Sequence, residues 1–166
     1  MVNQFLTFKL DGATYAVEVH KVQEVLEYTH ITKVPCIADY FEGLINSRGK
    51  GITVVNFRKK FAMETIPVSK QTRIIVLEIK KGNEIVTFGA IADSVQEVIE
   101  LEESEIEPPP KFGSDIAAQY IKGIGKRNGE FLMILSIDEI FSTDEVINLK
   151  NVMVLPEEES EEEIEE

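Results

Sequence analysis

The sequence predicts an all-β protein built from two tandem barrels, with one short helix near the C-terminus. Three observations favour this fold class. The chain of 166 residues contains an internal repeat, each copy alternates apolar and polar residues as half-buried strands do, and glycine-containing turns separate the apolar runs. Short strands joined by tight turns are typical of small barrels, which leave few strand edges exposed.

The internal repeat is carried by two blocks of sequence. VQEV at residues 22–25 recurs at 95–98, an offset of 73 residues, and 40–61 aligns without a gap on 120–141, an offset of 80 residues. The change of offset places an insertion of seven residues within 101–119, which contains EPPP and is predicted to be a loop. The pairs identical in both copies of the second block are Tyr40 and Tyr120, Gly43 and Gly123, Gly49 and Gly129, and Phe61 and Phe141.

Each copy is predicted to open with a β-hairpin. Residues 6–10 and 15–19 alternate in polarity around the turn Asp11-Gly12. Residues 75–79 and 84–92 repeat this arrangement in the second copy around a glycine-containing turn. Both patterns have the period of two that places alternate side chains on opposite faces of a sheet.

Later in each copy, the runs ITVVNF and FLMILSI predict strands buried on both faces, because they are apolar and rich in β-branched or aromatic residues. The segments SRGKG and KRNGE precede these runs at matched positions and predict hairpin turns. A helix is expected over about 138–150, with Ile140, Phe141 and Ile147 on one face.

The domain organisation follows from the repeat and from the charge distribution. One domain over 1–155 is expected to contain two barrels, about 4–68 and 71–142, with an exchange of terminal segments between them left open, and 15–61 should superpose on 86–141. Eight glutamates lie in the last ten residues, and without them the net charge of −13 falls to −5. Because such a block repels itself and cannot build a core, 156–166 is predicted to be a disordered acidic tail.

Composition and motifs argue against several classes of function. The segment 43–50 has five residues between its first glycine and Gly-Lys, whereas a phosphate-binding loop has four, and 123–129 is out of register for a dinucleotide site. No metal-site spacing relates His20, His30 and Cys36, so we expect no metal, cofactor or catalytic residue. The acidic balance argues against nucleic acid as a partner.

The same composition bears on location. The N-terminal residues MVNQFLTFKLDG lack the basic and continuous apolar regions of a signal peptide, and no run reaches the roughly 20 apolar residues of a membrane helix. A single cysteine cannot form an internal disulfide. We therefore expect a cytoplasmic protein without direct membrane insertion.

Several segments in order resemble the family of CheW-like domains. YAVEVHKVQEVLE at 15–27 and GLINSRGKGITVVNFRKKF at 43–61 are similar to the first barrel of that family, and IADSVQEVIE at 91–100 and YIKGIG at 120–125 are similar to the second. The resemblance covers about residues 4–142. Two departures occur: the family usually has leucine where this chain has Ser47, and proline where it has Thr53.

The resemblance implies two five-stranded SH3-like barrels with no catalytic activity and no cofactor. It further implies an adaptor that couples the regulatory domain of a CheA-type histidine kinase to the cytoplasmic tip of methyl-accepting chemotaxis receptors, in arrays at the membrane. The alternatives are a scaffold of another receptor–kinase pathway and a fragment of a kinase regulatory domain. A nucleic-acid-binding barrel is a further alternative, which would need a basic face.

Partner-binding residues are expected at the repeated motifs. In the family, the N-x-R-G segment lies near the receptor groove, and the repeat mate of Arg48 is Asn128, so the fold does not require arginine there. We expect Arg48 to be exposed beside Glu24, and only the first copy to form such a pair. Paired glycines at 43 and 123 predict positive φ or a close backbone approach. The expected receptor- or kinase-binding residues are Val22, Glu24, Gly43, Asn46, Arg48, Gly49, Val95 and Gly123.

Overall fold

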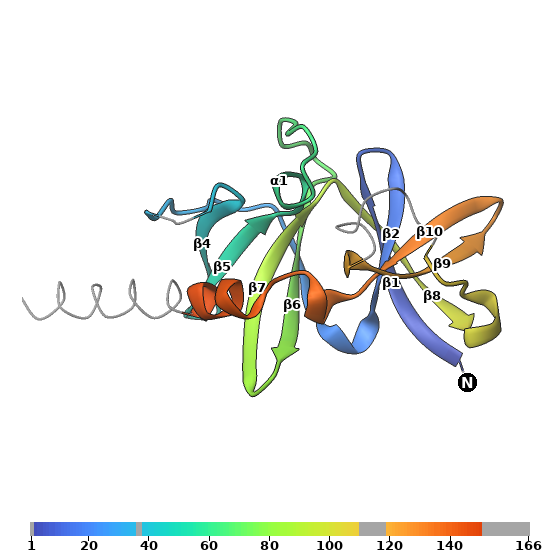
Figure 1. Ribbon diagram of the computed structural model, residues 1–166. Coiled ribbons are helices and arrows are strands. Elements are labelled where there is room, and N and C mark those ends of the chain that lie inside the picture. The colour runs from blue at the N-terminus through green and yellow to red at the C-terminus, as the bar shows by residue number, and fades with distance from the viewer. Residues whose placement is uncertain (1, 36–37, 110–118, 151–166) are drawn as a thin grey trace, which may run out of the picture.

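The computed structural model describes residues 2–35, 38–109 and 119–150. Ten strands form two curled five-stranded sheets, which lie side by side as two barrels in Figure 1. The strands are β1 (Val2–Leu10), β2 (Ala13–Glu18), β3 (Val22–Glu27), β4 (Phe41–Ser47), β5 (Lys50–Asn56), β6 (Arg73–Lys81), β7 (Glu84–Ala92), β8 (Ser94–Glu102), β9 (Ile121–Arg127) and β10 (Glu130–Leu135).

The two barrels exchange hairpins. The sheet orders are β8-β1-β2-β10-β9 and β3-β6-β7-β5-β4, so each barrel combines the opening hairpin of one copy with the last three strands of the other. We call them the terminal barrel (β1, β2, β8, β9 and β10) and the central barrel (β3 to β7). The ranges 4–68 and 71–142 are therefore not the barrels, because each range contributes strands to both. A repeat shows which strands are equivalent, but both copies have the same pattern, so it cannot show which copy a hairpin joins.

The strand registers relate the two barrels residue by residue. In the central barrel Gly43 pairs with Val54, and in the terminal barrel Gly123 pairs with Ile134, which keeps the offset of 80 found in the sequence. The parallel contacts agree, since Thr53 lies opposite Phe88 where Met133 lies opposite Tyr15. The aligned residues of the two copies thus occupy equivalent places in different barrels.

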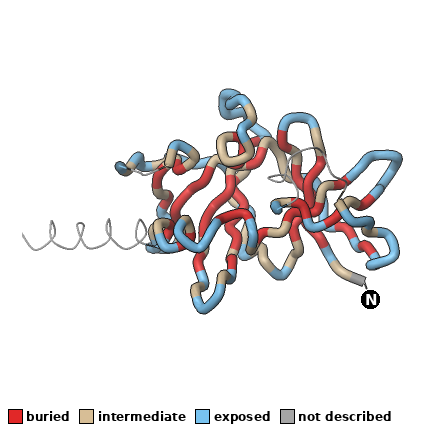
Figure 2. The backbone as a smooth tube through the Cα atoms, viewed as in Figure 1, coloured by how far each residue is buried: buried red, intermediate tan, exposed pale blue. Residues whose placement is uncertain are grey.

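Three hydrophobic clusters hold the molecule together. Small clusters fill the interior of each barrel, and the largest lies between the barrels, where it collects the outward faces of β1, β2, β5, β6 and β7. Figure 2 shows this buried zone along the strands, and the turns and loops are largely exposed. Because the barrels share their main core, neither forms a separate globular unit.

The C-terminal segment returns from the terminal barrel to pack against the central one (Figure 1). The helix expected over 138–150 begins later: Ile137–Glu139 form a 3-10 turn, and the α-helical residues described are 143–150. The reason is a capping box, in which the Ser142 hydroxyl accepts from the Glu145 amide at 3.2 Å and the Glu145 carboxylate accepts from the Ser142 amide at 2.9 Å. With this start Val146 and Leu149 are buried and Ile147 is 43% exposed, so the face predicted for Ile147 was wrong.

Thr53 on β5 carries a buried hydroxyl oxygen without a hydrogen-bond partner in the described residues. A buried unpaired hydroxyl costs about 1–3 kcal/mol in lost hydration, so Thr53→Val should raise the free energy of unfolding by about 1 kcal/mol. Chemical denaturation measures this difference. Thr7→Val is the matched control. The equally buried Thr7 hydroxyl donates to the Glu97 carbonyl at 2.9 Å, so its removal should lower the free energy of unfolding. Equal destabilisation by both variants would contradict the prediction.

Candidate functional site

Three hairpins of the molecule end in the same two-residue turn with positive φ at both central residues. Asp11-Gly12 has φ of 53° and 80°, and Asn128-Gly129 has 53° and 79°. These are type I′ geometries, for which Asx-Gly is the preferred sequence. The β4–β5 turn has φ of 55° and 82°, but its first central residue is Arg48. Left-handed backbone costs an arginine roughly 1–2 kcal/mol, so this side chain is retained at some expense of stability.

The Arg48 side chain points into solvent. It is 84% exposed, and its Nε lies 4.0 Å from a carboxylate oxygen of Glu24, which is 25% exposed on β3. An exposed pair at this distance contributes about 0–1 kcal/mol to stability. The arginine is therefore exposed beside Glu24, as expected, and its guanidinium donates no hydrogen bond to any other described residue.

Asn46 shapes the turn that presents Arg48. Its side-chain oxygen accepts a hydrogen bond from the Gly49 amide at 3.0 Å, across the two-residue loop. Such a bond satisfies a backbone donor in the turn and fixes the direction in which Arg48 leaves the strand. Glu24, Asn46, Arg48 and Gly49 thus gather at one end of the central barrel, and Val22 lies on the same strand as Glu24.

The other expected site residues lie elsewhere. Gly43 and Gly123 are buried, and a Cβ would lie 2.1 Å from the Thr32 carbonyl oxygen at the first and 2.5 Å from a methyl carbon of Ile106 at the second. The close approach predicted at both glycines is therefore present, and positive φ occurs at Gly43 alone. Val22 and Val95 are half-buried against the core between the barrels, and Val95 and Gly123 belong to the terminal barrel.

Only the first copy was expected to pair this glutamate with an arginine at the turn, and the second copy forms a glutamate–arginine pair from a different position. In the terminal barrel Glu97, the repeat mate of Glu24, lies 3.8 Å from Arg127, which is 42% exposed. Arg127 precedes the turn residue Asn128, so the arginine comes from the strand end instead of the strained position. The signal was present in the sequence KRNGE, one residue away from the aligned position.

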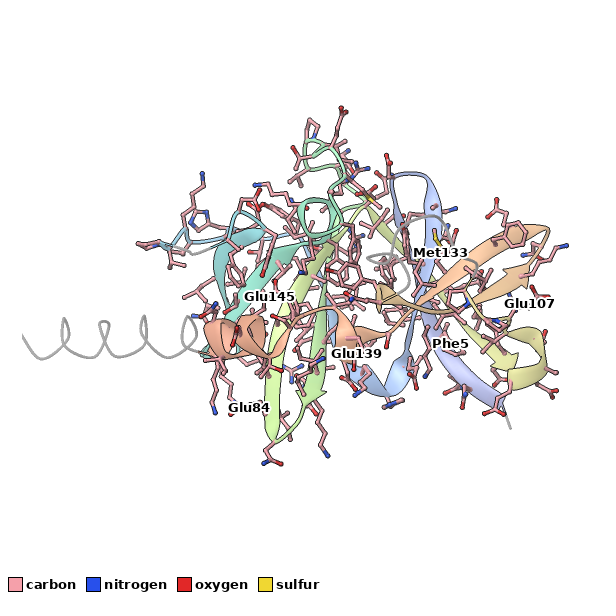
Figure 3. All side chains as sticks on the ribbon, viewed as in Figure 1. Phe5, Glu84, Glu107, Met133, Glu139 and Glu145 are labelled. Atoms are coloured by element: carbon pink, nitrogen blue, oxygen red, sulfur yellow. The ribbon has the colours of Figure 1, made fainter. Side chains whose placement is uncertain are left out.

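Sequence reasoning also missed a lysine enclosed by aromatic rings between the barrels. The Lys60 side chain is 7% exposed and its Nζ lies 2.9 Å from Glu145 on the C-terminal helix, which Figure 3 labels. The same ammonium lies 4.8, 5.5 and 5.3 Å from the ring centres of Tyr40, Tyr120 and Phe141. The rings and the carboxylate stabilise the charge by cation–π and ionic contacts, so this cluster binds the helix to both barrels.

The carboxylate of Glu145 is held ionised in this cluster. Burial alone would raise its pKa, but the hydrogen bonds from the Ser142 amide, the Tyr40 hydroxyl and the Lys60 ammonium outweigh burial and lower the pKa. Burial and the bond to Glu145 raise the pKa of Tyr40, which keeps its hydroxyl protonated as the donor. In this cluster the three donors all bond to the Glu145 carboxylate, and the Lys60 ammonium balances its charge.

Two ion-pair clusters bind the segments where the chain crosses between barrels. Arg58, which follows β5 in α1 (Phe57–Lys60), is 8% exposed and donates to both oxygens of Asp93 at 2.9 and 2.6 Å. Its guanidinium also donates to the Glu64 carbonyl at 2.7 Å and lies 3.7 Å from Asp11. Burial opposes ionisation of Asp93, but the bonds from Arg58 and the Asp11 amide lower its pKa.

The second crossing has the opposite arrangement of charge. The repeat mate of Arg58 is Asp138, whose two carboxylate oxygens accept from the Lys21 ammonium at 3.0 and 2.9 Å. One of them also accepts from the Lys80 amide at 2.9 Å, as Asp93 accepts from the Asp11 amide in the first cluster. At the first crossing the basic Arg58 thus contacts two acidic residues. At the second crossing its repeat mate, the acidic Asp138, contacts a basic residue.

The described residues contain neither a cluster suited to a metal ion nor a membrane-spanning helix. Within 2–35, 38–109 and 119–150, no group of three or more His, Cys, Asp or Glu side chains is placed to hold a metal ion. His20 lies 3.6 Å from Glu18, while Cys36 and the acidic tail lie outside the described residues. Nor does that part of the chain contain a helix long and apolar enough to cross a membrane.

Comparisons with known proteins agree with this architecture. The CheW-like domain family matches residues 4–145. Chemotaxis protein CheW from Klebsiella aerogenes is 30% identical over 149 residues, covering 90% of this chain and 87% of that protein. CheW from Thermotoga maritima is 31% identical over 140 residues, covering 82% and 86%.

A solved structure is similar as well. The crystal structure of the scaffolding protein TtCheW from Thermoanaerobacter tengcongensis has a TM-score of 0.76 and 33% identity, and the match covers 87% of this chain and 90% of that one. Two five-stranded barrels, an internal repeat and a family match over most of the chain lead to one conclusion. The chain belongs to the CheW family.

Proposed function

We propose that this protein is a non-catalytic chemotaxis adaptor. It couples the regulatory domain of a CheA-type histidine kinase to the cytoplasmic tip of methyl-accepting chemoreceptors, in cytoplasmic arrays associated with the membrane. The observation that carries the proposal is the likeness, over most of the chain, to proteins named for chemotaxis and to a crystal structure described as a scaffolding protein. An adaptor acts by holding partners together, so it needs binding surfaces and no cofactor.

We place partner binding at the turn that presents Arg48. Its backbone position favours asparagine, as the equivalent turn of the terminal barrel shows, yet the residue is an arginine with an exposed guanidinium. Strained backbone at an exposed residue supports a role outside folding. The set Val22, Glu24, Gly43, Asn46, Arg48, Gly49, Val95 and Gly123 keeps its assignment to receptor or kinase binding, with Gly43 and Gly123 acting through the backbone they shape.

Substitution of Arg48 tests this assignment. Arg48→Asn should leave the free energy of unfolding unchanged or raise it by up to about 1 kcal/mol, because asparagine suits the left-handed turn. The same variant should weaken partner binding by about thirtyfold, the loss expected for a charged residue central to an interface. Arg48→Lys should not fully restore binding, since lysine lacks the planar two-pronged donor.

Denaturation curves and titrations with a receptor fragment and with the kinase regulatory domain give the two measurements. Asn128→Asp is the matched control, because it changes the equivalent turn of the terminal barrel without removing an arginine. If Arg48→Asn unfolds the protein, or leaves both affinities unchanged, the assignment of Arg48 is wrong.

The coupling role itself is tested by reconstitution. Purified kinase and receptor should show receptor-dependent kinase activity only when this protein is added, and the protein alone should not turn over nucleotide. Capture from lysate then identifies the pathway. Recovery of another receptor–kinase pair would support a scaffold of a different pathway, and recovery as part of a longer kinase chain would support a regulatory-domain fragment. Salt-sensitive binding to nucleic acid would contradict the adaptor role.

A further inference from the structure

One end of the central barrel collects exposed cations around an exposed apolar side chain. Lys50 at the start of β5 and Lys80 near the end of β6 are exposed, and neither forms an ion pair within the described residues. Arg48 in the β4–β5 turn is exposed as well, and Ile85 near the start of β7 is 58% exposed. We call Arg48, Lys50, Lys80 and Ile85 the basic end of the barrel.

Strand registers place these residues at one end. β7 runs parallel to β5 with Thr53 beside Phe88, so three residues earlier the starts of the two strands, at Lys50 and Ile85, lie at the same end of the barrel. β6 and β7 form a hairpin in which Lys80 lies opposite Ile85. Because neighbouring strands are only about 4.8 Å apart, one extended peptide can contact several of these side chains at once.

The acidic side chains of this region do not neutralise the basic end. Three of them have lysine partners: Glu84 with Lys150, Asp138 with Lys21, and Glu139 with Lys81. The other two, Glu24 and Glu78, lie at least two residues further from the end than Lys80 in the strand register. The three cations of the basic end therefore outnumber the acids that could satisfy them.

The last ten residues of the sequence match this surface in charge and in apolar content. Residues 157–166 contain eight glutamates and a single apolar residue, Ile164, which stands between Glu163 and Glu165. The basic end has the converse pattern, because Ile85 lies on the strand between those that carry Lys80 and Lys50. Opposite charges flanking an apolar residue on both sides favour binding of one segment to the other.

We propose that residues 157–166 dock on the basic end of their own chain, with glutamates at the three cations and Ile164 against Ile85. The described chain ends at Lys150, whose ammonium donates to Glu84, the residue before Ile85, at 2.8 Å. Residues 151–164 span up to about 50 Å when extended, so they reach the basic end from this point. Closing so short a loop costs little entropy, and the tether keeps the segment at a high effective concentration.

Docking has a consequence for partner binding, because the basic end includes Arg48. This consequence, unlike the docking itself, rests on the proposed function. A partner that needs Arg48 binds only molecules whose acidic segment is released, and its apparent affinity falls in proportion to that fraction. If the segment covers the turn for about two thirds of the time, replacing its eight glutamates with glutamine should tighten partner binding about threefold.

Paramagnetic broadening of amide signals in the full chain tests the docking without any partner. A nitroxide is attached at Ser160→Cys in a Cys36→Ser background, which leaves one thiol. Two variants carrying this label neutralise the contact: Arg48→Asn with Lys50→Gln and Lys80→Gln, and the chain with eight glutamines in residues 157–166. Lys70→Gln is the matched control, because Lys70 is exposed and precedes β6 at the opposite end of the barrel. Denaturation midpoints establish that each variant is folded.

We expect broadened signals for residues 48–50 and 84–86 in the labelled parent and in the Lys70→Gln control, and sharp signals for residues 70–73. The broadening should fall about twofold or more in both neutralised variants, and in 1 M salt, where the Debye length is about 3 Å. Equal broadening in the parent and the neutralised variants would show a tethered segment that does not dock, and would overturn the proposal.

Mixing distinguishes the chain's own segment from that of a second copy. A nitrogen-15 copy without nitroxide should keep sharp signals when a nitroxide-labelled copy is added, and broadening in this mixture would also overturn docking within one chain. Titrations with the receptor fragment and the kinase regulatory domain then test the consequence separately. Docking together with unchanged partner affinity in the glutamine variant would contradict the regulation of Arg48 and leave the docking supported.

Discussion

Replacing Arg58 with alanine is expected to lower the free energy of unfolding by about 3–5 kcal/mol, as measured by chemical denaturation. The side chain is 9% exposed and holds both oxygens of Asp93, so its removal leaves a partly buried carboxylate without its charged partner. It also releases the Glu64 carbonyl and the contact with Asp11 at the crossing between the barrels. The loss is a large fraction of the stability of a domain of this size.

Two controls separate this effect from general loss of charge. Lys59→Ala removes the neighbouring cation, which is 34% exposed and 3.1 Å from Glu42, and should cost less than about 1 kcal/mol. Arg58→Met combined with Asp93→Asn should recover much of the loss, because the double variant leaves no unpaired charge and the amide oxygen can still accept from Asp11. A cost below about 1 kcal/mol for Arg58→Ala would show that the pair is not important to stability.

The substitution Gly43→Ala should destabilise the protein by about 3 kcal/mol or more, and the equivalent Gly123→Ala by only about 1–2 kcal/mol. At Gly43 the added Cβ would lie 2.1 Å from the Thr32 backbone oxygen, at a φ of +140° that alanine rarely adopts. At Gly123 the nearest atom is a side-chain methyl of Ile106 at 2.5 Å, which can rotate away, and the backbone oxygen of Glu107 is 3.1 Å distant. The Thr32 oxygen beside Gly43 belongs to the backbone and cannot rotate away in this manner.

Thermal or chemical denaturation of the two variants measures the difference, and Gly49→Asn serves as a control. Gly49 also has positive φ, but nothing lies within 4 Å of its Cβ position and asparagine tolerates this conformation. Similar losses at 43 and 123 would mean that the backbone conformation at Gly43 contributes little, and that contact with the neighbouring loop segment alone sets the cost.

Much of the fold could be predicted from local patterns. The hairpins, the turn residues Asp11-Gly12 and Asn128-Gly129, and the equivalence of Gly43 with Gly123 all depend on neighbours in sequence or on the repeat. The exchange of hairpins could not be predicted, because it depends on which of two similar edges a hairpin meets. Contacts such as that of Lys60 with Glu145 depend on this arrangement and have no local signal.

The candidate site was predictable where it depends on the turn. Arg48 beside Glu24 follows from a hairpin whose end lies next to β3, and it was expected from the sequence. The pair between Glu97 and Arg127 was missed because the aligned position holds Asn128, while a side chain one residue earlier is long enough to reach the same glutamate. Strict alignment of the copies therefore underestimates what a flexible arginine can contact.

The exchange of hairpins also decides how the molecule responds to being pulled. A partner that grips the terminal barrel holds β1 and β2 from the first copy and β8, β9 and β10 from the second, and a partner on the central barrel holds the complementary set. Tension between two such partners therefore runs through the covalent backbone at both crossings and through hydrogen bonds of both sheets. We therefore expect the two barrels to bear such a load together, as one body.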